Sequence, residues 1–284
     1  MLFKDLYDRY YTRHALIRLK EPSNVRYWWS AHGSHWQDKD IAQITQGDIQ
    51  DWFDDLASRS KSSAVRAVNQ LSAIVNWGIR RKYFAGPNPC QGVEKIKLQP
   101  RERFLLPNEI DALRNALAKE PQIYQDFFWL CLLTGARRGN VLAMEWSEID
   151  TRLATWRIPP HKFKNGQSHT IALTAPALAI LERRLTQSHK YSSLFVFPSS
   201  KIQSHLAEPK RAWKRIIRRA GLTDLRIHDL RRTLGSYLAI DGQSQYTIGK
   251  ALGHIDPRST AVYARLNLDP VRRALEVTHS RFLH

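Results

Sequence analysis

Six side chains between positions 137 and 263 could together bind a phosphodiester and attack it. They are Arg137, Lys164, His228, Arg231, His254 and Tyr263. Arginine forks match the nonbridging oxygens of a phosphate with paired hydrogen bonds. A tyrosine hydroxyl can act as a nucleophile, and a lysine can protonate a departing oxygen. The set therefore indicates phosphoryl-transfer chemistry on a nucleic acid.

The local sequence predicts where each of these side chains lies, at a helix end, after a glycine turn or on one face of a helix. Arg137 follows an apolar helix that a Thr-Gly pair ends. His228 and Arg231 are three positions apart and share one face of a predicted helix. His254 follows a glycine cap, and Tyr263 lies nine positions later in the next predicted helix. Taken singly, each also fits an ordinary role, such as a surface arginine, a helix-terminal histidine or a core aromatic.

A predicted β-hairpin carries the lysine. Segments 154–158 and 170–173 are typical of strands, and between them the dipeptide Asn165-Gly166 favours a tight turn. Lys164 lies at this tip, where it could reach toward DNA, and Lys162 is close to it. A solvated turn lysine is the ordinary explanation for both.

Elsewhere the apolar spacing predicts helices, so we expect a mainly α fold with a small β-hairpin sheet. The first 84 residues form a predicted four-helix unit, with Thr45 as the N-cap of its third helix. A stretch rich in proline and basic residues follows, which is typical of a linker. The expected organisation is a helical DNA-binding domain at 1–86, a basic linker at 87–104 and a catalytic domain at 105–284.

The charge of the chain indicates a polyanionic partner. Its 44 Lys and Arg residues against 26 Asp and Glu residues give a formal net charge of +18. These residues are spread along the chain, which indicates a basic surface over much of the fold rather than a basic tail. A merely basic soluble protein is the alternative. The candidate DNA contacts are Arg66, Arg80, Arg81, Lys82, Lys95, Lys97 and Lys162.

Cysteine usage and the chain start indicate the compartment. Cys90 and Cys131 have no spacing for a disulfide framework or a zinc site, and Cys131 lies in an apolar run typical of a core. That run is far shorter than the roughly 20 residues that cross a bilayer. The first residues, MLFKDLYDRYY, lack the pattern of a signal peptide. We expect a cytoplasmic protein, compatible with a nucleoid location and with no membrane partner.

Four segments together resemble the tyrosine recombinase, or phage integrase, family. TGARRGNVL is similar to the family's first-arginine box, HKFKNG to its hairpin lysine, HDLRRT to its His-x-x-Arg box and LGHIDPRSTAVYARL to its histidine and tyrosine box. The resemblance covers about 105–266 and has a compatible helical domain before it. It implies a site-specific DNA recombinase.

The resemblance also implies a role for each residue. Arg137 and Arg231 would hold the scissile phosphate and stabilise its developing charge. Tyr263 would attack the phosphorus and leave a 3′-phosphotyrosyl bond, while Lys164 would protonate the departing 5′ oxygen. Since the ester conserves the bond energy, the reaction needs no metal and no cofactor.

His228 would assist proton transfer to or from the tyrosine, and His254 would hydrogen-bond the phosphate. One position departs from the family pattern. Asn140 stands three residues after the first arginine, where many members carry an acid. An amide can hydrogen-bond a guanidinium but brings no opposing charge, which affects how Arg137 is oriented.

The family's architecture implies a C-shaped clamp on double-stranded DNA, a homotetramer on two DNA sites, a monomer off DNA, and accessory DNA-bending factors. The segment Pro270–Thr278 is expected to pack either on a neighbouring protomer or on its own domain. Nothing before Phe3 could form the arm-binding domain of many integrases, so either this member does without it or the chain is a fragment.

Two alternative functions use the same sequence features. One is DNA relaxation by a type IB topoisomerase, which has a similar residue set. The other is a DNA-binding protein that keeps the fold without cleavage, for which Asn140 is the single argument.

Overall fold

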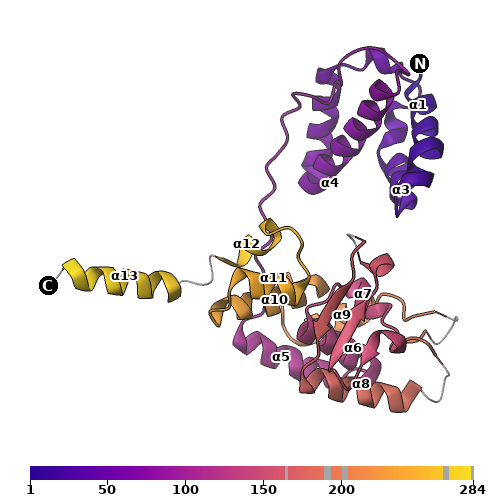
Figure 1. The fold of residues 1–284 in the computed structure, drawn as a ribbon. Helices are drawn as coiled ribbons and strands as arrows, with labels where there is room; N and C mark the ends of the chain where they lie inside the picture. The colour runs from indigo at the N-terminus through magenta and orange to yellow at the C-terminus, as the bar shows by residue number, and fades with distance from the viewer. Residues whose placement is uncertain (164–165, 189–192, 200–203, 265–268, 283–284) are drawn as a thin grey trace. The chain divides into compact units, whose positions relative to one another are not determined.

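A computed structural model describes residues 1–163, 166–188, 193–199, 204–264 and 269–282. The chain divides into two compact units, Met1–Arg101 and Glu102–His284. Helices dominate both units, and the second also holds a small antiparallel sheet (Figure 1). This confirms the predicted fold class. Of the helices in the described ranges, none has both the length and the apolar composition that crossing a bilayer requires.

The first unit is built from helices around an aromatic core. Its elements are α1 (Phe3–Tyr10), a π-helical turn (Tyr11–Ala15), α2 (Leu16–Arg18), α3 (Pro22–Ala31), two 3₁₀ turns (Gly33–Trp36 and Ile41–Gln43) and α4 (Gln46–Arg80). The rings of Tyr7 and Trp29 stack with their centroids 4.0 Å apart. Phe3, Leu6, Ile49 and Phe53 are fully buried in the same core.

The long helix α4 begins at the predicted cap. The Thr45 hydroxyl accepts a hydrogen bond from the Asp48 backbone at 3.1 Å, and the Asp48 carboxylate accepts one from the Thr45 backbone at 2.9 Å. These bonds satisfy two N–H groups that a helix start leaves unpaired. Ser60 is extended, with φ −161° and ψ 102°, so α4 bends there. The third and fourth helices of the predicted four-helix unit are thus the two arms of α4.

The second unit packs its helices around α6. Its helices are α5 (Pro107–Leu117), α6 (Gln122–Thr134), α7 (Arg138–Leu142), α8 (Ala175–Ser188), α9 (Lys210–Arg219), α10 (Ile227–Ile240), α11 (Gln245–Leu252), α12 (Arg258–Ala264) and α13 (Asp269–Phe282), with 3₁₀ turns at Trp146–Glu148 and Pro160–Lys162. α6 packs against α8 and α10. Phe127, Phe128 and Cys131 of α6 are buried, as the apolar run around Cys131 predicts.

The sheet has three antiparallel strands in the order β1-β2-β3: β1 (Ile149–Asp150), β2 (Thr155–Ile158) and β3 (His169–Ala172). β2 and β3 are the predicted hairpin strands, and Trp156 pairs with Ile171. β1 was not predicted, because two residues are too short for an alternating pattern. Outside this sheet, Phe195 makes an isolated antiparallel bridge to Glu145.

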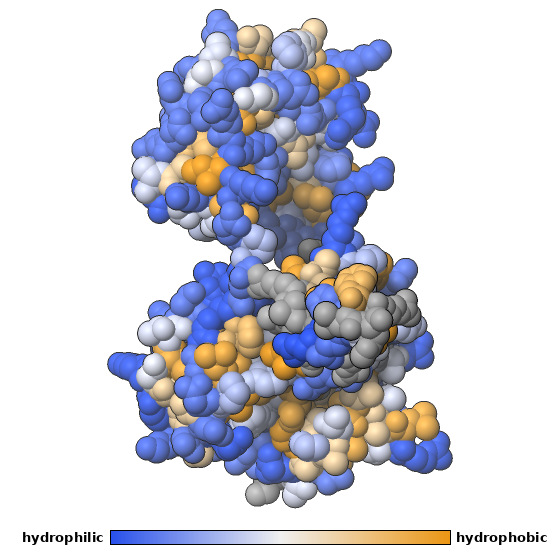
Figure 2. All heavy atoms as spheres, turned by 90° about the vertical axis from the view of Figure 1, so that its left-hand side faces the viewer, coloured by the Kyte–Doolittle hydropathy of each residue, from blue (hydrophilic) through white to orange (hydrophobic). Residues whose placement is uncertain are grey.

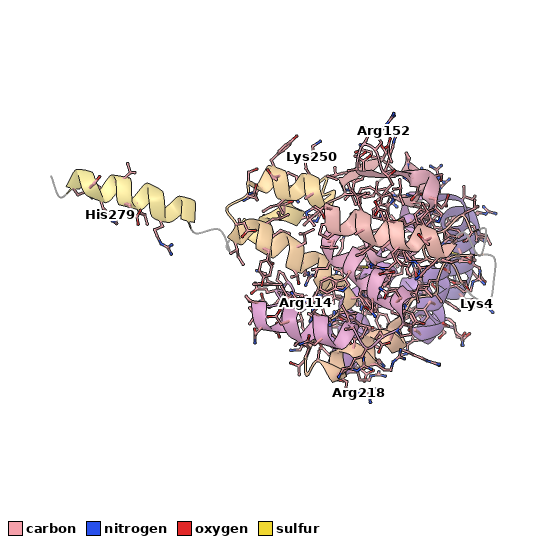
Figure 3. All side chains as sticks on the ribbon, turned by 90° about the horizontal axis from the view of Figure 1, so that it is seen from below. Lys4, Arg114, Arg152, Arg218, Lys250 and His279 are labelled. Carbon is pink, nitrogen blue, oxygen red and sulfur yellow. The ribbon has the colours of Figure 1, made fainter. Side chains whose placement is uncertain are left out.

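Basic side chains lie on opposite sides of the second unit. In Figure 3, Lys250 of α11 lies near the upper edge and Arg218 of α9 at the lower edge, with Arg114 of α5 between them. On the face of the molecule shown in Figure 2, hydrophilic residues cover most of the surface, and the apolar ones form scattered patches. The labelled basic residues thus lie on more than one side of this unit.

Candidate active site

The turn after α6 presents Arg137. Gly135 adopts a left-handed conformation at φ +58°, where a side chain would be strained and its Cβ would lie 2.7 Å from Leu252. Arg137 follows as the N-cap of α7, and its guanidinium lies over the ring of Phe163 at 4.5 Å from the centroid. Its Nη1 atom is buried with no hydrogen-bond partner among the described residues. The arginine is therefore held by its flat face, which leaves donor groups for a ligand.

Arg231 reaches the same turn from α10. Its side chain is 5% exposed, and its Nη1 donates a 2.6 Å hydrogen bond to the Gly135 carbonyl. Burial, together with the nearby charge of Arg137, lowers the pKa of Arg231 to about 10, so the group stays protonated at neutral pH. Two guanidinium groups share one site, and neither pairs with a carboxylate among the described residues, which is an arrangement suited to an anion.

Tyr263 of α12 lies beside this pair. It is 6% exposed and packs against α10, where a Cβ at Gly235 would lie only 2.6 Å from its Cζ atom. Burial raises the pKa of Tyr263, and the charges of Arg231 and Arg232 oppose that rise. The phenol is thus protonated at rest, but its anion would have a cation nearby.

The two predicted histidines also lie near Arg231. The ring of His254 lies parallel to that of Tyr263, at 7° and 6.5 Å between centroids, and its Nδ1 is 2.9 Å from the Thr260 hydroxyl. Burial and then Arg231 lower the pKa of His254 to about 4. His228, at the start of α10, keeps part of its ring in solvent, and the same two causes lower its pKa. Both imidazoles are neutral at physiological pH.

The described chain thus brings five of the six predicted site residues together: Arg137, His228, Arg231, His254 and Tyr263. The sixth, Lys164, lies outside the described residues. Asn140 is buried in α7, and its Nδ2 atom has no hydrogen-bond partner in the described ranges. Within the described part of the chain, no three His, Cys, Asp or Glu side chains group as metal ligands.

Lys162, a candidate DNA contact, is an ion-paired lysine rather than a solvated turn lysine. It is 14% exposed, and its ammonium contacts Glu145 at 2.6 Å, Glu148 at 2.5 Å and the Ala143 carbonyl at 2.8 Å. Two carboxylates and a carbonyl satisfy its three donors. The ammonium of Lys162 is thus already engaged inside the second unit, which counts against a DNA contact, and its role on DNA stays a prediction.

The other candidate DNA contacts belong to the first unit and have exposed side chains: Arg66, Arg80, Arg81, Lys82, Lys95 and Lys97. Lys95 donates to the Asn69 side chain at 2.9 Å, and Arg66 to the Ser62 carbonyl at 3.1 Å. Neither contact involves an acid. Their role on DNA stays a prediction.

Sequence reasoning missed His169 and Phe163, which lie beside the site. Both line a cavity of about 500 Å³, together with His254 and residues of α11. The two rings lie 5.3 Å apart. No local pattern distinguishes His169 among the 11 histidines of the chain, since its neighbours come from α11, more than 70 positions later.

A family model described as "Phage integrase family" matches residues 103–269. The chain belongs to the phage integrase family. This integrase-family chain is 25% identical to the ICEBs1 integrase of Bacillus subtilis over 86% of its own length and 73% of that protein. It is 29% identical to the integrase of Salmonella phage P22, but over 50% of its own length and 38% of that protein. The predicted family is thereby confirmed.

Solved structures share the fold of this family member. A lambda integrase dimer bound to a COC′ core site has a TM-score of 0.74 at 20% identity, over 90% of this chain and 96% of that one. The Tn1549 transposon integrase in complex with circular intermediate DNA has a TM-score of 0.76 at 12% identity, over 97% and 99% of the two chains.

Proposed function

We propose that this chain is a tyrosine-type site-specific DNA recombinase that cleaves and rejoins strands through a 3′-phosphotyrosyl intermediate. The observation that carries the proposal is the position of Tyr263. This buried phenol lies against α10 at Gly235, about one helical turn from Arg231, and parallel to the His254 ring. Membership of the phage integrase family supports it further.

In the proposed reaction the Tyr263 oxygen attacks the scissile phosphorus. A bond forms between that oxygen and phosphorus, and the bond from phosphorus to the 5′ oxygen breaks. The phenol proton passes to a base, for which His228 is the candidate, and Lys164 gives a proton to the departing 5′ oxygen. In the reverse reaction, a 5′ hydroxyl attacks the phosphorus of the phosphotyrosine. The bond between phosphorus and the tyrosine oxygen breaks, and the free tyrosine is restored.

The two arginines would stabilise the phosphorane-like charge. Arg137 has a buried donor without a partner in the described ranges, and Arg231 is fixed by the Gly135 carbonyl. Donors that are oriented before the substrate arrives need no reorganisation as charge develops. The neutral His254 would add one hydrogen bond to a phosphate oxygen.

The partner we propose is double-stranded DNA, bound by a helical domain at 1–86 and a catalytic domain at 105–284, with the basic linker 87–104 on the phosphates. The net charge of +18 supports this partner, as do the DNA complexes of the lambda and Tn1549 integrases. The active assembly would be a homotetramer on two sites formed from monomers with DNA-bending factors, in the cytoplasm at the nucleoid.

Covalent trapping tests the function. Wild type, Tyr263→Phe and Tyr246→Phe are incubated with nicked duplexes from DNA flanking the gene, without added metal, and run on a denaturing gel. Tyr246 is a matched control because it is 73% exposed on the neighbouring α11. We expect an adduct with wild type and Tyr246→Phe only.

An adduct with Tyr263→Phe would refute the assignment of Tyr263 as the nucleophile, and relaxation of supercoils by monomers without strand exchange would indicate a topoisomerase. Tight DNA binding with no adduct would indicate a protein that does not cleave.

A further inference from the structure

A chain of contacts joins Arg137 to His254 through the strand hairpin. The Arg137 guanidinium lies 4.5 Å from the Phe163 ring centroid, and the Phe163 and His169 rings lie 5.3 Å apart at 41°. Both rings lie against Gly253, which directly precedes His254. The hairpin side chains thus fill the space between one candidate phosphate ligand and the turn that carries another.

Gly253 makes this contact close. A Cβ there would lie 2.7 Å from the Cδ2 and Nε2 atoms of His169 and 2.9 Å from Phe163, distances that real Cβ atoms do not show. Gly253 is also the left-handed cap of α11, at φ +65°. The imidazole therefore lies directly on the backbone of the turn, with no side chain between them.

The chemistry of His169 suits this place. The ring is partly buried at the first position of β3, and its Nε2 is shielded from solvent with no hydrogen-bond partner in the described ranges. Burial and then Arg231 lower the pKa of His169, while a hydrogen bond with the Ala251 backbone opposes them. A neutral imidazole can lie near two guanidinium groups without repelling them. A charged lysine at this position would repel both.

We propose that His169 is a positioning residue for strand cleavage: it fixes the Gly253 turn, and through it His254, relative to Arg137. The proposal rests on the recombinase function proposed above. His169 acts through these neighbours, because its contacts are with Phe163 and the turn rather than with Tyr263. Misplacing a catalytic group by about 1 Å can slow a reaction on the order of 100-fold.

The test measures single-turnover adduct formation on a nicked duplex at saturating protein, alongside the Kd for the same DNA. His169→Ala is compared with His161→Ala, a matched control because His161 is an exposed histidine of the same hairpin segment. We expect His169→Ala to form adduct about 10- to 100-fold more slowly, with Kd and Tm close to wild type. His161→Ala should match wild type. His169→Phe, which keeps a ring against Gly253, should recover part of the rate.

A double-mutant cycle separates positioning from general destabilisation. If His169 acts through His254, the pair His169→Ala with His254→Ala should be no more than about twofold slower than His254→Ala alone. Independent losses that multiply would overturn the proposal, as would a wild-type rate for His169→Ala. The proposal would also be overturned if the slower adduct formation of His169→Ala were fully explained by a lower Tm or by weaker DNA binding. No adduct with wild type itself would instead refute the recombinase function.

Discussion

At the scale of single residues, the basic side chains in and near the candidate site differ in whether a carboxylate already neutralises their charge. Arg137 and Arg231 lie together, and Arg231 donates to the Gly135 carbonyl rather than to an acid in the described part of the chain. Lys162, close in sequence, instead contacts two carboxylates. A basic residue indicates a phosphate contact only where no acid already neutralises it, and a sequence does not give that information.

Lys162→Met should therefore affect stability and not DNA affinity. Methionine keeps most of the volume but leaves Glu145 and Glu148 without their shared cation, so the free energy of unfolding should fall by about 1 to 3 kcal/mol. Chemical denaturation measures this change, with Lys119→Met as an exposed control. A stable variant that binds DNA much more weakly would show that Lys162 contacts phosphate after all.

The motifs pointed to residues that the structure brings close together, because each stands next to its own turn or helix start, while their catalytic roles stay predictions. Arg137 follows the Gly135 turn, and His254 follows Gly253. His169 could not be found this way. Its importance comes from contact with Gly253, a residue of another segment, and a single sequence contains no sign of that pairing.

At the scale of elements, α10 is the support on which the site is assembled. It carries His228 and Arg231 near its start and meets α12 at Gly235. Glycine in a helix interior costs stability relative to alanine, so its presence here needs a packing reason. That reason is the Tyr263 ring, which occupies the place of the missing side chain.

Gly235→Ala should reduce cleavage without unfolding the protein. The added methyl would meet the Tyr263 Cζ at 2.6 Å and displace the phenol, so adduct formation should slow about 10-fold or more. Gly139→Ala is the matched control, since Gly139 is a helical glycine of α7 with open space at its Cβ position. Single-turnover trapping measures the rate of adduct formation, and circular dichroism shows whether each variant is folded. Unchanged cleavage by Gly235→Ala would mean that the ring position is not critical.

Element boundaries followed from the sequence where side chains form the ends. Thr45 caps α4 with Asp48, and a glycine ends both α6 and α11. The break in α4 is a bend at Ser60 rather than a loop, because continuous apolar spacing on both sides lets the two arms nearly join. β1 could not be predicted, since its two residues form a strand only by pairing with β2.

At the scale of the whole molecule, charge and protonation set the conditions of activity. The excess of basic residues predicts DNA binding that weakens as salt rises. Three neutral histidines gather near Arg231: His169, His228 and His254. For each, burial is the largest cause of a lowered pKa and Arg231 is the next.

These histidines should make the fold sensitive to mild acid. The unfolded imidazoles have a pKa of about 6.5, above their folded values, so the unfolded chain binds more protons below that pH. Their stabilising contribution is complete above about pH 7 and is lost as pH falls toward about 4, the folded pKa of His254. Tm should therefore fall between about pH 6.5 and 5, before most carboxylates titrate.

Calorimetry at constant ionic strength measures this dependence, and His254→Gln should make the slope shallower. A single proton contributes at most about 1.4 kcal/mol per pH unit, so the effect of one histidine is measurable. A Tm that stays constant over this range would show that the three imidazoles protonate freely in the folded protein.

The burial of Tyr263 also bears on how such a protein could search a genome. The hydroxyl lies in a side chain that is 6% exposed, with a raised pKa, and is therefore a weak nucleophile until a phosphate displaces its surroundings. A recombinase meets very many wrong sequences before the right one. If Tyr263 is the nucleophile, its burial and raised pKa would slow attack during those encounters, so passing contacts would leave the chromosome without accidental nicks and fidelity would begin before any base is read.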